Sequence, residues 1–312
     1  MIPRGVLLSG GTGFIGGHVI RALRARGIGV WVWSRDAARA RGRLPADVHA
    51  VGALSEILAD APIDALVNLA GAQVLGWPWT RARRRVLIDS RVKTSEALIE
   101  WCARRAGTPG AVVPRTMISA SAIGFYGPGG DDWFDETSPP QSNFQCELCV
   151  ARERATEPAR ALGMRVVNLR IGLVLGANGG VLTPLALAAR LCGAAVIGDG
   201  RQWMSWIHID DMVRIVERAL EDDRWDGPVN AVAPNPVQQR DFQRALTGVL
   251  HRPLWLRVPG ALLELTLGDM AELLVEGQRV APRRLLQAGF IYTHTVLEDA
   301  LRDLLHANGG RT

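Results

Sequence analysis

Short apolar runs alternate with helical patterns through the first half of the chain. The apolar runs, of the length and composition of buried strands, fall at 5–9, 28–33, 48–51, 64–69, 116–121 and 165–169. Between them, apolar residues recur with helical spacing, at 14–26, 81–105 and 147–162. Strands separated by helices indicate right-handed crossovers, so we predict an α/β fold with a doubly wound parallel sheet covered on both faces.

The rhythm of the pattern changes after Gly176. A helical stretch and a short apolar run precede a loop rich in Gly and Trp; another helix and strand follow, at 211–221 and 229–232. From residue 238 onward the pattern is mostly helical and is interrupted by Pro and Gly. We therefore predict a first domain at 1–180, with 205–233 returning to it, and a smaller, mostly helical C-terminal lobe from 181–204 and 234–312.

The composition fits a globular protein, with 48% hydrophobic and 21% charged residues among 312. The net charge of +5 comes from arginine, since Lys93 is the only lysine. The densest basic run, Arg81-Ala82-Arg83-Arg84-Arg85, stands at a predicted helix start. A solvated helix face explains it better than a polyanion-binding patch, so we expect no nucleic-acid partner.

Four cysteines in a chain of this length are too few for a disulfide framework. The N-terminus shows no charged-then-apolar leader, and every apolar stretch is broken by charge or proline before it reaches about 18 residues. We expect a soluble, cytoplasmic protein that does not bind membranes. Whether it forms a homodimer stays open.

Three glycines, Gly10, Gly13 and Gly16, stand between the first strand and the first helix. The first permits a tight turn, the second lets a pyrophosphate approach the backbone, and the third allows close packing of helix on strand. Phe14 and Ile15 then open a helix whose N-terminal N–H groups favour phosphate. This arrangement predicts a Rossmann-type dinucleotide-binding domain.

The second predicted strand ends in Trp33-Ser34-Arg35-Asp36. An acidic residue at such a strand tip favours the ribose 2′-hydroxyl of NAD, whereas arginine pairs with a 2′-phosphate. Ser34 occupies the tip and Arg35 follows it, so we predict NADP(H), with Asp36 capping the next segment. Leu69, Ala70 and Gly71 end the fourth strand, where small residues let the cofactor approach the backbone.

Together with the segment Ser119-Ala120-Ser121-Ala122-Ile123-Gly124-Phe125-Tyr126-Gly127, these motifs resemble those of the extended short-chain dehydrogenases. More narrowly, the chain is similar nearly end to end to their epimerase-like atypical branch. Two stretches are the most specific to that branch, Trp206-Ile207-His208-Ile209-Asp210-Asp211 and Gly277-Gln278-Arg279-Val280-Ala281-Pro282. The resemblance implies an NADP(H) site lined by Ser34, Arg35, Leu69, Ala70, Arg91 and Val174.

The chain departs from the wider family in its acid–base residues. Short-chain dehydrogenases use a Tyr-x-x-x-Lys pair, in which tyrosine moves a proton and lysine lowers the tyrosine pKa. Here the corresponding positions hold Gln145 and Cys149, and no such pair exists anywhere in the sequence. Glutamine does not titrate and a thiol cannot replace an ammonium group, so the usual chemistry is not implied.

Without the Tyr/Lys pair, two residues remain as candidates for catalysis. Ser121 stands at the position of the family's catalytic serine, where it would bind a substrate oxygen or, equally, satisfy the strand end. Tyr126 is the only phenol expected near the cleft, and we hypothesise that it donates the proton. The leading function is an NADP(H)-dependent oxidoreductase or epimerase acting on an unidentified small molecule. The alternative is a protein that senses NADP(H) without turning it over.

Other candidates have simpler explanations. Cys146 and Cys149 lack further ligands at zinc spacing, so we expect no metal site, although a reactive thiol stays open. Asp210 and Asp211 precede a predicted helix, where one of them would cap it, and His208 is a core or cleft-edge histidine. Five loop tryptophans are expected to wall an apolar substrate pocket that the loop 198–206 closes: Trp77, Trp79, Trp133, Trp203 and Trp206.

Overall fold

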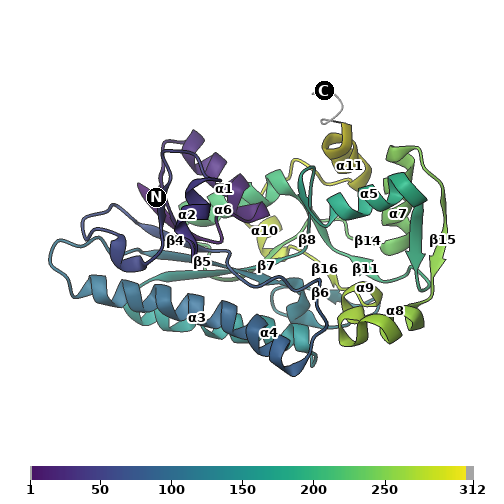
Figure 1. Ribbon diagram of the computed structural model, residues 1–312, viewed down its shortest axis with the longest axis horizontal. Helices are drawn as coiled ribbons and strands as arrows, with labels where there is room; N and C mark the ends of the chain where they lie inside the picture. The colour runs from purple at the N-terminus through teal and green to yellow at the C-terminus, as the bar shows by residue number, and fades with distance from the viewer. Residues whose placement is uncertain (1, 307–312) are drawn as a thin grey trace.

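The computed structural model describes residues 2–306, apart from the side chains of Cys192, Glu264 and Leu267. The end of the predicted C-terminal lobe, 307–312, lies outside the described residues. Figure 1 shows an elongated molecule, with the N-terminal elements at one end and α5 (Leu182–Cys192), α7 (Gln239–Leu250) and α8 (Gly260–Leu267) at the other.

A seven-stranded parallel sheet in the order β13-β7-β5-β4-β1-β2-β3 forms the centre of the fold. Its strands are β1 (Gly5–Ser9), β2 (Gly29–Trp33), β3 (His49–Val51), β4 (Ala65–Asn68), β5 (Thr116–Ala122), β7 (Arg165–Ile171) and β13 (Gly227–Ala231). The chain winds outward from β1 in both directions, which creates a topological switch point between β1 and β4. The predicted α/β Rossmann-type fold is confirmed.

Helices cover both faces of this sheet. Figure 1 shows α3 (Arg81–Ala106) and α4 (Phe144–Arg154) below it and α1 (Phe14–Ala25) and α6 (Ile209–Glu221) above it. On α1 the buried residues Gly16, Val19, Ile20 and Leu23 recur with helical spacing, which explains why this face packs inward. The short elements of this half are α2 (Ala37–Arg41), β6 (Trp133–Phe134) and the 3₁₀ turns η1 (Leu54–Glu56), η2 (Ile123–Tyr126) and η3 (Glu157–Leu162).

The single helix predicted over 147–162 is wrong. The structure ends α4 at Arg154 and starts the separate 3₁₀ turn η3 at Glu157, with Pro158 in its first turn. Proline has no N–H to donate and its ring clashes with the preceding turn, so a helix cannot continue through this position without a break.

The C-terminal portion is largely helical, as predicted, but it also contains short strands, most of which the pattern did not reveal. Its helical elements are α5 (Leu182–Cys192), α7 (Gln239–Leu250), α8 (Gly260–Leu267), η4 (Gly268–Ala271), α9 (Glu272–Val275), α10 (Arg283–Gln287) and α11 (Leu297–His306). Its strands are β8 (Leu173–Gly176), β9 (Gly179–Gly180), β10 (Ala194–Ile197), β11 (Trp203–Met204), β12 (Trp206–His208), β14 (Val237–Gln238), β15 (Leu254–Val258) and β16 (Arg279–Val280).

Small sheets connect this portion to the rest of the chain. β12, β8 and β9 form one sheet, β10 pairs with β15, β11 with β14, and β16 with β6. β13 is the edge strand of the main sheet, although it follows α5 and α6 in the sequence. The predicted domain boundaries stay a prediction. Within residues 2–306, no helix is both long enough and apolar enough to cross a membrane.

Candidate cofactor and active site

The glycine turn joins the carboxyl end of β1 to the start of α1. Gly10 has φ +77°, and a Cβ there would lie 2.8 Å from the backbone of Leu69 and Ala70. A Cβ on Gly16 would lie 2.4 Å from the Gly10 carbonyl oxygen. Both positions therefore require glycine, one for conformation and one for the close approach of helix to turn.

The N-terminus of α1 has neither a side-chain cap nor an acidic residue in its first turn. Gly13 is the N-cap residue, and its own N–H donates to the Gly10 carbonyl oxygen at 3.0 Å. The N–H groups of the first helical turn thus point outward without an intrahelical acceptor. Together with the helix dipole they form a site suited to an anion such as a pyrophosphate.

A cavity of about 630 Å³ opens over this turn, at the switch point of the sheet. Seven of the predicted cofactor residues line it: Gly10, Gly13, Ser34, Arg35, Leu69, Ala70 and Gly71. Its volume falls in the range of cofactor pockets, about 300–1,000 Å³. The residues present therefore fit a dinucleotide, whose pyrophosphate the N–H groups at the start of α1 would hold.

The tip of β2 carries Ser34 and Arg35 at the wall of this cavity. Asp36 is turned away from it, because its carboxylate accepts the Arg39 N–H at 2.9 Å and caps α2, as predicted. Within residues 2–306, the exposed Arg35 guanidinium has no hydrogen bond or ion pair. The strand tip thus offers an uncommitted cation and no free carboxylate.

A hydrogen-bonded chain fixes the floor of the cavity. The Ser9 hydroxyl donates to Asn68 Oδ1 at 2.7 Å, and the Asn68 amide donates to the Ser95 hydroxyl at 3.0 Å. These three buried side chains connect β1, β4 and α3. Arg152, a residue of α4, donates a hydrogen bond of 2.8 Å to the Asn68 carbonyl oxygen. Neighbouring helices therefore hold both strand ends under the cavity.

Five predicted cofactor residues do not line the cavity. Gly16 lies beneath the turn, and Ile15 packs on the core. The Phe14 ring fills a slot against Gly176, Gly179 and Gly180, where added Cβ atoms would meet it within 3.0 Å. Val174 is buried in β8, and Arg91 lies behind the wall and donates to the Ala72 carbonyl at 3.1 Å.

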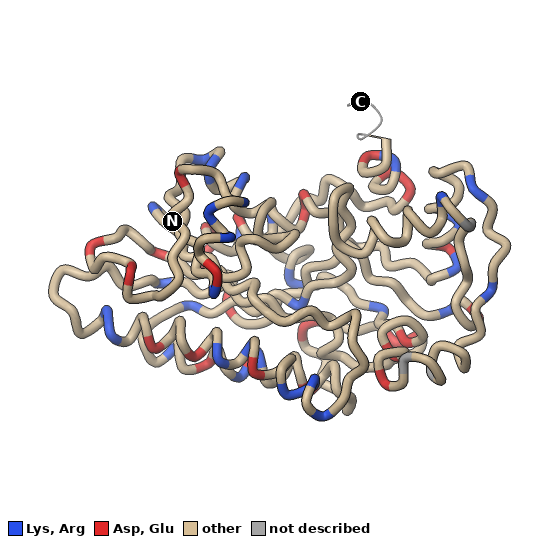
Figure 2. Tube along the Cα trace, viewed as in Figure 1, with Lys and Arg blue, Asp and Glu red and all other residues tan. Residues whose placement is uncertain are grey.

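One helix face lines the cavity without having been predicted. Val86, Asp89, Ser90, Lys93 and Thr94 of α3 form this wall. Their spacing of three and four residues places them on one side of a helix, a signal that the sequence contained. Asp89 and Lys93, four residues apart, form an ion pair at 2.9 Å in this wall of the cavity. Figure 2 shows basic and acidic residues interspersed along α3.

Ser121 lies at the carboxyl end of β5, on the same edge of the sheet as the glycine turn. Its hydroxyl donates to Glu153 Oε1 at 2.7 Å, and Glu153 is held by a paired contact with Arg170 at 2.9 and 3.0 Å. Because its hydrogen is committed to Glu153, the Ser121 oxygen is left as an acceptor. It can accept a hydrogen bond from a substrate hydroxyl.

Tyr126 occupies a different environment from the one expected. Its side chain is fully buried; its hydroxyl donates to Asn230 Oδ1 at 2.6 Å and accepts from Arg170 at 3.1 Å. Burial raises the pKa of Tyr126 to about 12. A phenol that faces a carboxamide and a guanidinium inside the core is poorly placed to meet a substrate, so these contacts do not favour the proton-donor role.

The positions of the missing Tyr/Lys pair lie on α4, against η2. Gln145 packs over Gly124, and the Cys149 thiol lies 3.6 Å from the Ala122 carbonyl oxygen. Burial raises the pKa of Cys149 to about 11 and also raises that of Cys146. Both sulfurs are buried, and raised pKa values disfavour the thiolate form, so these contacts do not favour the reactive thiol that the sequence left open.

The acidic pair at α6 also differs from expectation. The helix is capped by His208, whose Nδ1 accepts the Asp210 N–H at 3.1 Å. Asp211 is fully buried and accepts the N–H groups of Thr293 and His294 at 2.8 and 2.9 Å. The capping role predicted for an aspartate is wrong, because this carboxylate satisfies a segment distant in the sequence. His208 was expected in the core or at a cleft edge; it is buried and also lines a cavity.

Two of the five tryptophans predicted to wall a pocket belong to the core instead. Trp206 is fully buried in β12, and Trp79 is buried between α3 and α4. Trp133 and Trp203 enclose the Arg279 guanidinium, whose carbon lies 4.2 and 4.1 Å from their ring centres. Closure of the loop 198–206 over a substrate stays a prediction.

Comparison with known proteins identifies the family. The NAD dependent epimerase/dehydratase family matches residues 6–231, which include the glycine turn, the Ser121 strand and β13. The chain belongs to this family. A second match, a domain of unknown function (DUF1731), covers residues 258–304. This member of the NAD dependent epimerase/dehydratase family is thus an NAD(P)-binding protein of the short-chain dehydrogenase type, and the resemblance seen in the sequence is confirmed.

Relatives match over almost the whole chain. The epimerase family protein YfhF of Bacillus subtilis is 34% identical, covering 96% of this chain and 97% of its own. The chloroplastic SDR39U1 homolog of Arabidopsis thaliana is 33% identical, covering 96% and 86%. Among solved structures, the human epimerase family protein SDR39U1, crystallised with NADPH, has a TM-score of 0.84 at 30% identity, covering 97% of this chain and 99% of that one.

Proposed function

We propose that this protein binds NADP(H) in preference to NAD(H), in the cavity over the glycine turn. The observation that carries the proposal is the tip of β2, where Ser34 and the uncommitted Arg35 line the cavity while Asp36 caps α2. A guanidinium beside the adenosine ribose recognises a 2′-phosphate, and the absence of a strand-tip carboxylate removes the usual NAD determinant. The NADPH in the structure of the human relative supports the same preference.

Arg35→Gln tests this preference directly. A lost charge-assisted bond of about 1.5–3 kcal/mol corresponds to a roughly 10- to 100-fold weaker Kd for NADPH, with little change for NADH. Arg41→Gln, an exposed arginine on α2 outside the cavity, is the matched control. Equal losses for NADPH and NADH, or no loss of either, contradict the proposal.

Ser34→Asp provides the reverse test. The new carboxylate repels a 2′-phosphate and accepts hydrogen bonds from a 2′-hydroxyl, so the ratio of NADPH to NADH affinity should fall by about tenfold or more. A ratio that stays unchanged in this variant argues that the β2 tip does not contact the ribose. Isothermal titration of each cofactor against the same protein preparation gives both constants.

We further propose that the protein is an oxidoreductase or epimerase acting on a small hydroxyl- or carbonyl-bearing molecule. A bound nicotinamide supplies or accepts the hydride in this chemistry. Ser121 would orient the substrate oxygen: with its hydrogen donated to Glu153 its lone pairs can accept from a substrate hydroxyl, and a turn of the hydroxyl away from Glu153 would let it donate to a carbonyl oxygen. Tyr126 has no part in this proposal, since its hydroxyl is enclosed by Asn230 and Arg170.

A sensor that binds NADP(H) without turnover is the second candidate. It is favoured by Gln145 and Cys149 at the acid–base positions, neither of which can move a proton at neutral pH. NADPH oxidation against a panel of aldehydes and ketones separates the two. Oxidation that Ser121→Ala reduces at least about tenfold while the NADPH Kd is unchanged supports the enzyme. Stoichiometric binding without oxidation of any member supports the sensor.

A further inference from the structure

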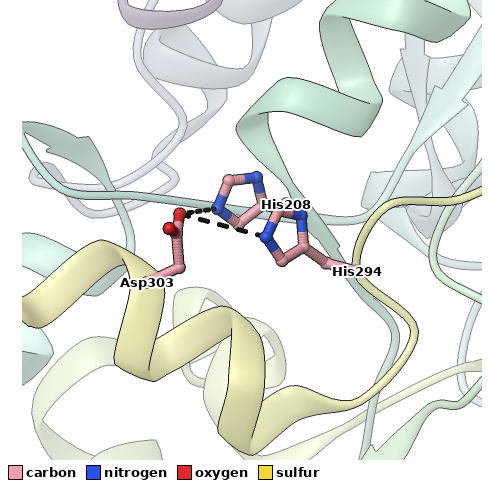
Figure 3. A group of neighbouring side chains, drawn as sticks. All are labelled: His208, His294 and Asp303. Carbon is pink, nitrogen blue, oxygen red and sulfur yellow. Dashed lines mark ion pairs between the residues drawn. The ribbon is translucent and has the colours of Figure 1, made fainter. Parts of the chain in front are cut away.

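A second cavity, of about 350 Å³, lies beside the cofactor cavity, and Gly13 borders both. Its walls come from α1, α6 and α11, and the residues include His18, Arg21, His208, Asp210 and Asp303. Two of these, His208 and Asp303, form a cluster with His294 in which one ligand-type atom of each residue lies within 4.8 Å of the others. Figure 3 shows the cluster, with Asp303 reaching from α11 toward both imidazole rings.

The Nε2 atoms of both histidines lie near the same oxygen of Asp303. His208 Nε2 lies 3.3 Å from Asp303 Oδ2, and His294 Nε2 lies 3.9 Å from the same oxygen. Tetrahedral coordination with bonds of about 2.0–2.1 Å separates neighbouring ligand atoms by about 3.3–3.4 Å. The first pair already has this separation, and the second needs a shift of roughly half an ångström, within the reach of one carboxylate rotation.

The imidazole nitrogens that face away from Asp303 have carboxylates near them. His208 Nδ1 lies 3.7 Å from Asp210 Oδ2, and His294 Nδ1 lies 3.8 Å from Asp211 Oδ2. Histidines that bind metals usually donate this second N–H to a carboxylate or carbonyl, which orients the ring and raises its basicity. The acidic pair at the start of α6 thus stands where an outer shell for two metal-binding histidines would be.

One of the ligand atoms is unsatisfied. The His208 side chain is 1% exposed, yet its Nε2, which faces Asp303, is buried without a hydrogen-bond partner within residues 2–306, whereas the unpartnered atom of His294 is Nδ1, on the side of Asp211. Buried polar atoms normally have partners, so each such atom needs an explanation. The rings also stack, with centroids 3.7 Å apart and planes at 23°, so one ring must turn before both Nε2 lone pairs can point at one ion.

We propose that His208, His294 and Asp303 bind a divalent transition-metal ion, Zn²⁺ being the representative. Two imidazoles with one carboxylate suit zinc and its borderline neighbours, whereas Mg²⁺ and Ca²⁺ prefer oxygen ligands throughout. The Asp303 side chain is 54% exposed at the cavity, which leaves room for water in the remaining coordination positions. The ion would join α11, the segment before it and the start of α6.

Metal binding would change the N-terminal cap of α6. A neutral imidazole that binds metal through Nε2 has its hydrogen on Nδ1, where His208 now accepts the Asp210 N–H. Metal binding therefore exchanges this cap for a bond from Nδ1 to the Asp210 carboxylate. Arg21 and His18 line the same cavity, and Arg214 neutralises Asp211 at 3.0 Å, so these are the nearby groups that temper the attraction for a cation.

The test uses the full-length chain without an affinity tag, freed of metal by EDTA and dialysed before titration with ZnCl₂ or CoCl₂. We expect one Zn²⁺ per chain by calorimetry, a higher Tm, and the visible absorption of Co²⁺ in a low-symmetry site. His294→Gln and Asp303→Asn should each weaken Zn²⁺ binding at least about tenfold. His306→Gln and Asp299→Asn, on the same helix outside the cluster, should bind as the unchanged chain does.

Two results would overturn the proposal. One is a folded, metal-free protein that binds neither ion above the level of the double variant His294→Gln/Asp303→Asn. The other is Zn²⁺ binding that both single variants retain at full strength, which would place the ion elsewhere. Because the experiment contains no cofactor, its outcome does not depend on whether the protein binds NADP(H).

Discussion

Two neighbouring glycines of α1 have different tolerance for a side chain. A Cβ on Gly16 would lie 2.4 Å from the Gly10 carbonyl oxygen, whereas a Cβ on Gly17 has no atom within 4 Å. Only the first position holds the turn against the helix. The pattern of three glycines therefore identifies a contact and not merely a flexible segment.

Gly16→Ala should reduce NADPH binding by at least about tenfold, because the helix must move off the turn that forms the phosphate site. Gly17→Ala should leave the Kd unchanged and raise the free energy of unfolding by about 0.5–1 kcal/mol, as expected when alanine replaces glycine inside a helix. Fluorescence titration and urea unfolding measure the two quantities. Equal effects of the two substitutions on the Kd would contradict the contact.

Tyr126→Phe should act on stability and not on the cofactor. The substitution leaves Asn230 Oδ1 without its donor inside the core and should lower the free energy of unfolding by about 1–3 kcal/mol. Tyr292→Phe, whose hydroxyl donates only to the Val232 carbonyl, should cost less and serves as the control. Loss of carbonyl-dependent NADPH oxidation with unchanged stability would restore Tyr126 as a proton donor.

At the scale of elements, α6 is held in place by the carboxylate of Asp211, a residue of its own first turn. Asp211 receives two backbone N–H groups from the segment before α11 and an ion pair from Arg214. Asp210 beside it is 62% exposed and makes no comparable contact. One aspartate of the pair therefore fastens two elements together, while its neighbour faces solvent.

Asp211→Asn should lower the free energy of unfolding by about 2–4 kcal/mol, since an amide cannot accept all of these bonds and charge-assisted bonds are the stronger ones. Asp210→Asn should change it by no more than about 0.5 kcal/mol. Both variants should be compared by urea unfolding with EDTA present, so that metal does not contribute. Similar losses in the two variants would show that the contact of Asp211 with the α11 segment is unimportant.

The elements that the sequence predicted best are the strands of the main sheet. Buried parallel strands are continuous apolar runs, so β1, β2 and β5 were recognised nearly to the residue. β15 was missed because the prolines and the glycine on either side of it break the segment into short pieces. The role of Asp211 was missed because its partners, Thr293 and His294, are brought to it by the tertiary fold, which local spacing cannot show.

In the cofactor site, too, some residues could be predicted from local sequence and others could not. Residues that act through the backbone, such as Gly10 and Ala70, were predicted because the turn has a fixed spacing. The polar face of α3 with Ser90 and Lys93 was not, because a polar helix stripe usually faces solvent. The His208, His294 and Asp303 cluster is invisible to ligand-spacing rules, since its members come from three separate segments.

For the whole molecule, carboxylates held by arginines predict the response to acid. The Arg4 side chain lowers the pKa of Asp64, and Arg224 lowers that of Asp222. Folded-state pKa values below those of the unfolded chain contribute stability above about pH 4, and this stability is lost as the pH falls further. Burial raises the pKa of Glu136, whose contribution has the opposite sign and offsets part of the loss.

The free energy of unfolding should therefore decrease between pH 5 and pH 3. Urea unfolding across this interval measures the slope, and the double variant Asp64→Asn/Asp222→Asn should show a shallower one because two of the groups that take up protons on unfolding are gone. The variant Asp132→Asn, an exposed aspartate without such a partner among the described residues, is the control. A slope that the double variant leaves unchanged would assign the acid response to other groups.

The position of β13 at the edge of the main sheet has a consequence for how the protein is made. As the nascent chain leaves the ribosome, β1 to β7 emerge before the strand that covers the outer edge of β7, which comes only with residues 227–231. Until then β7 presents a row of unpaired N–H and C=O groups above an apolar surface. During synthesis the free edge of β7 can therefore pair with a wrong strand. This risk ends only when β13, which follows α6 in the sequence, pairs with β7.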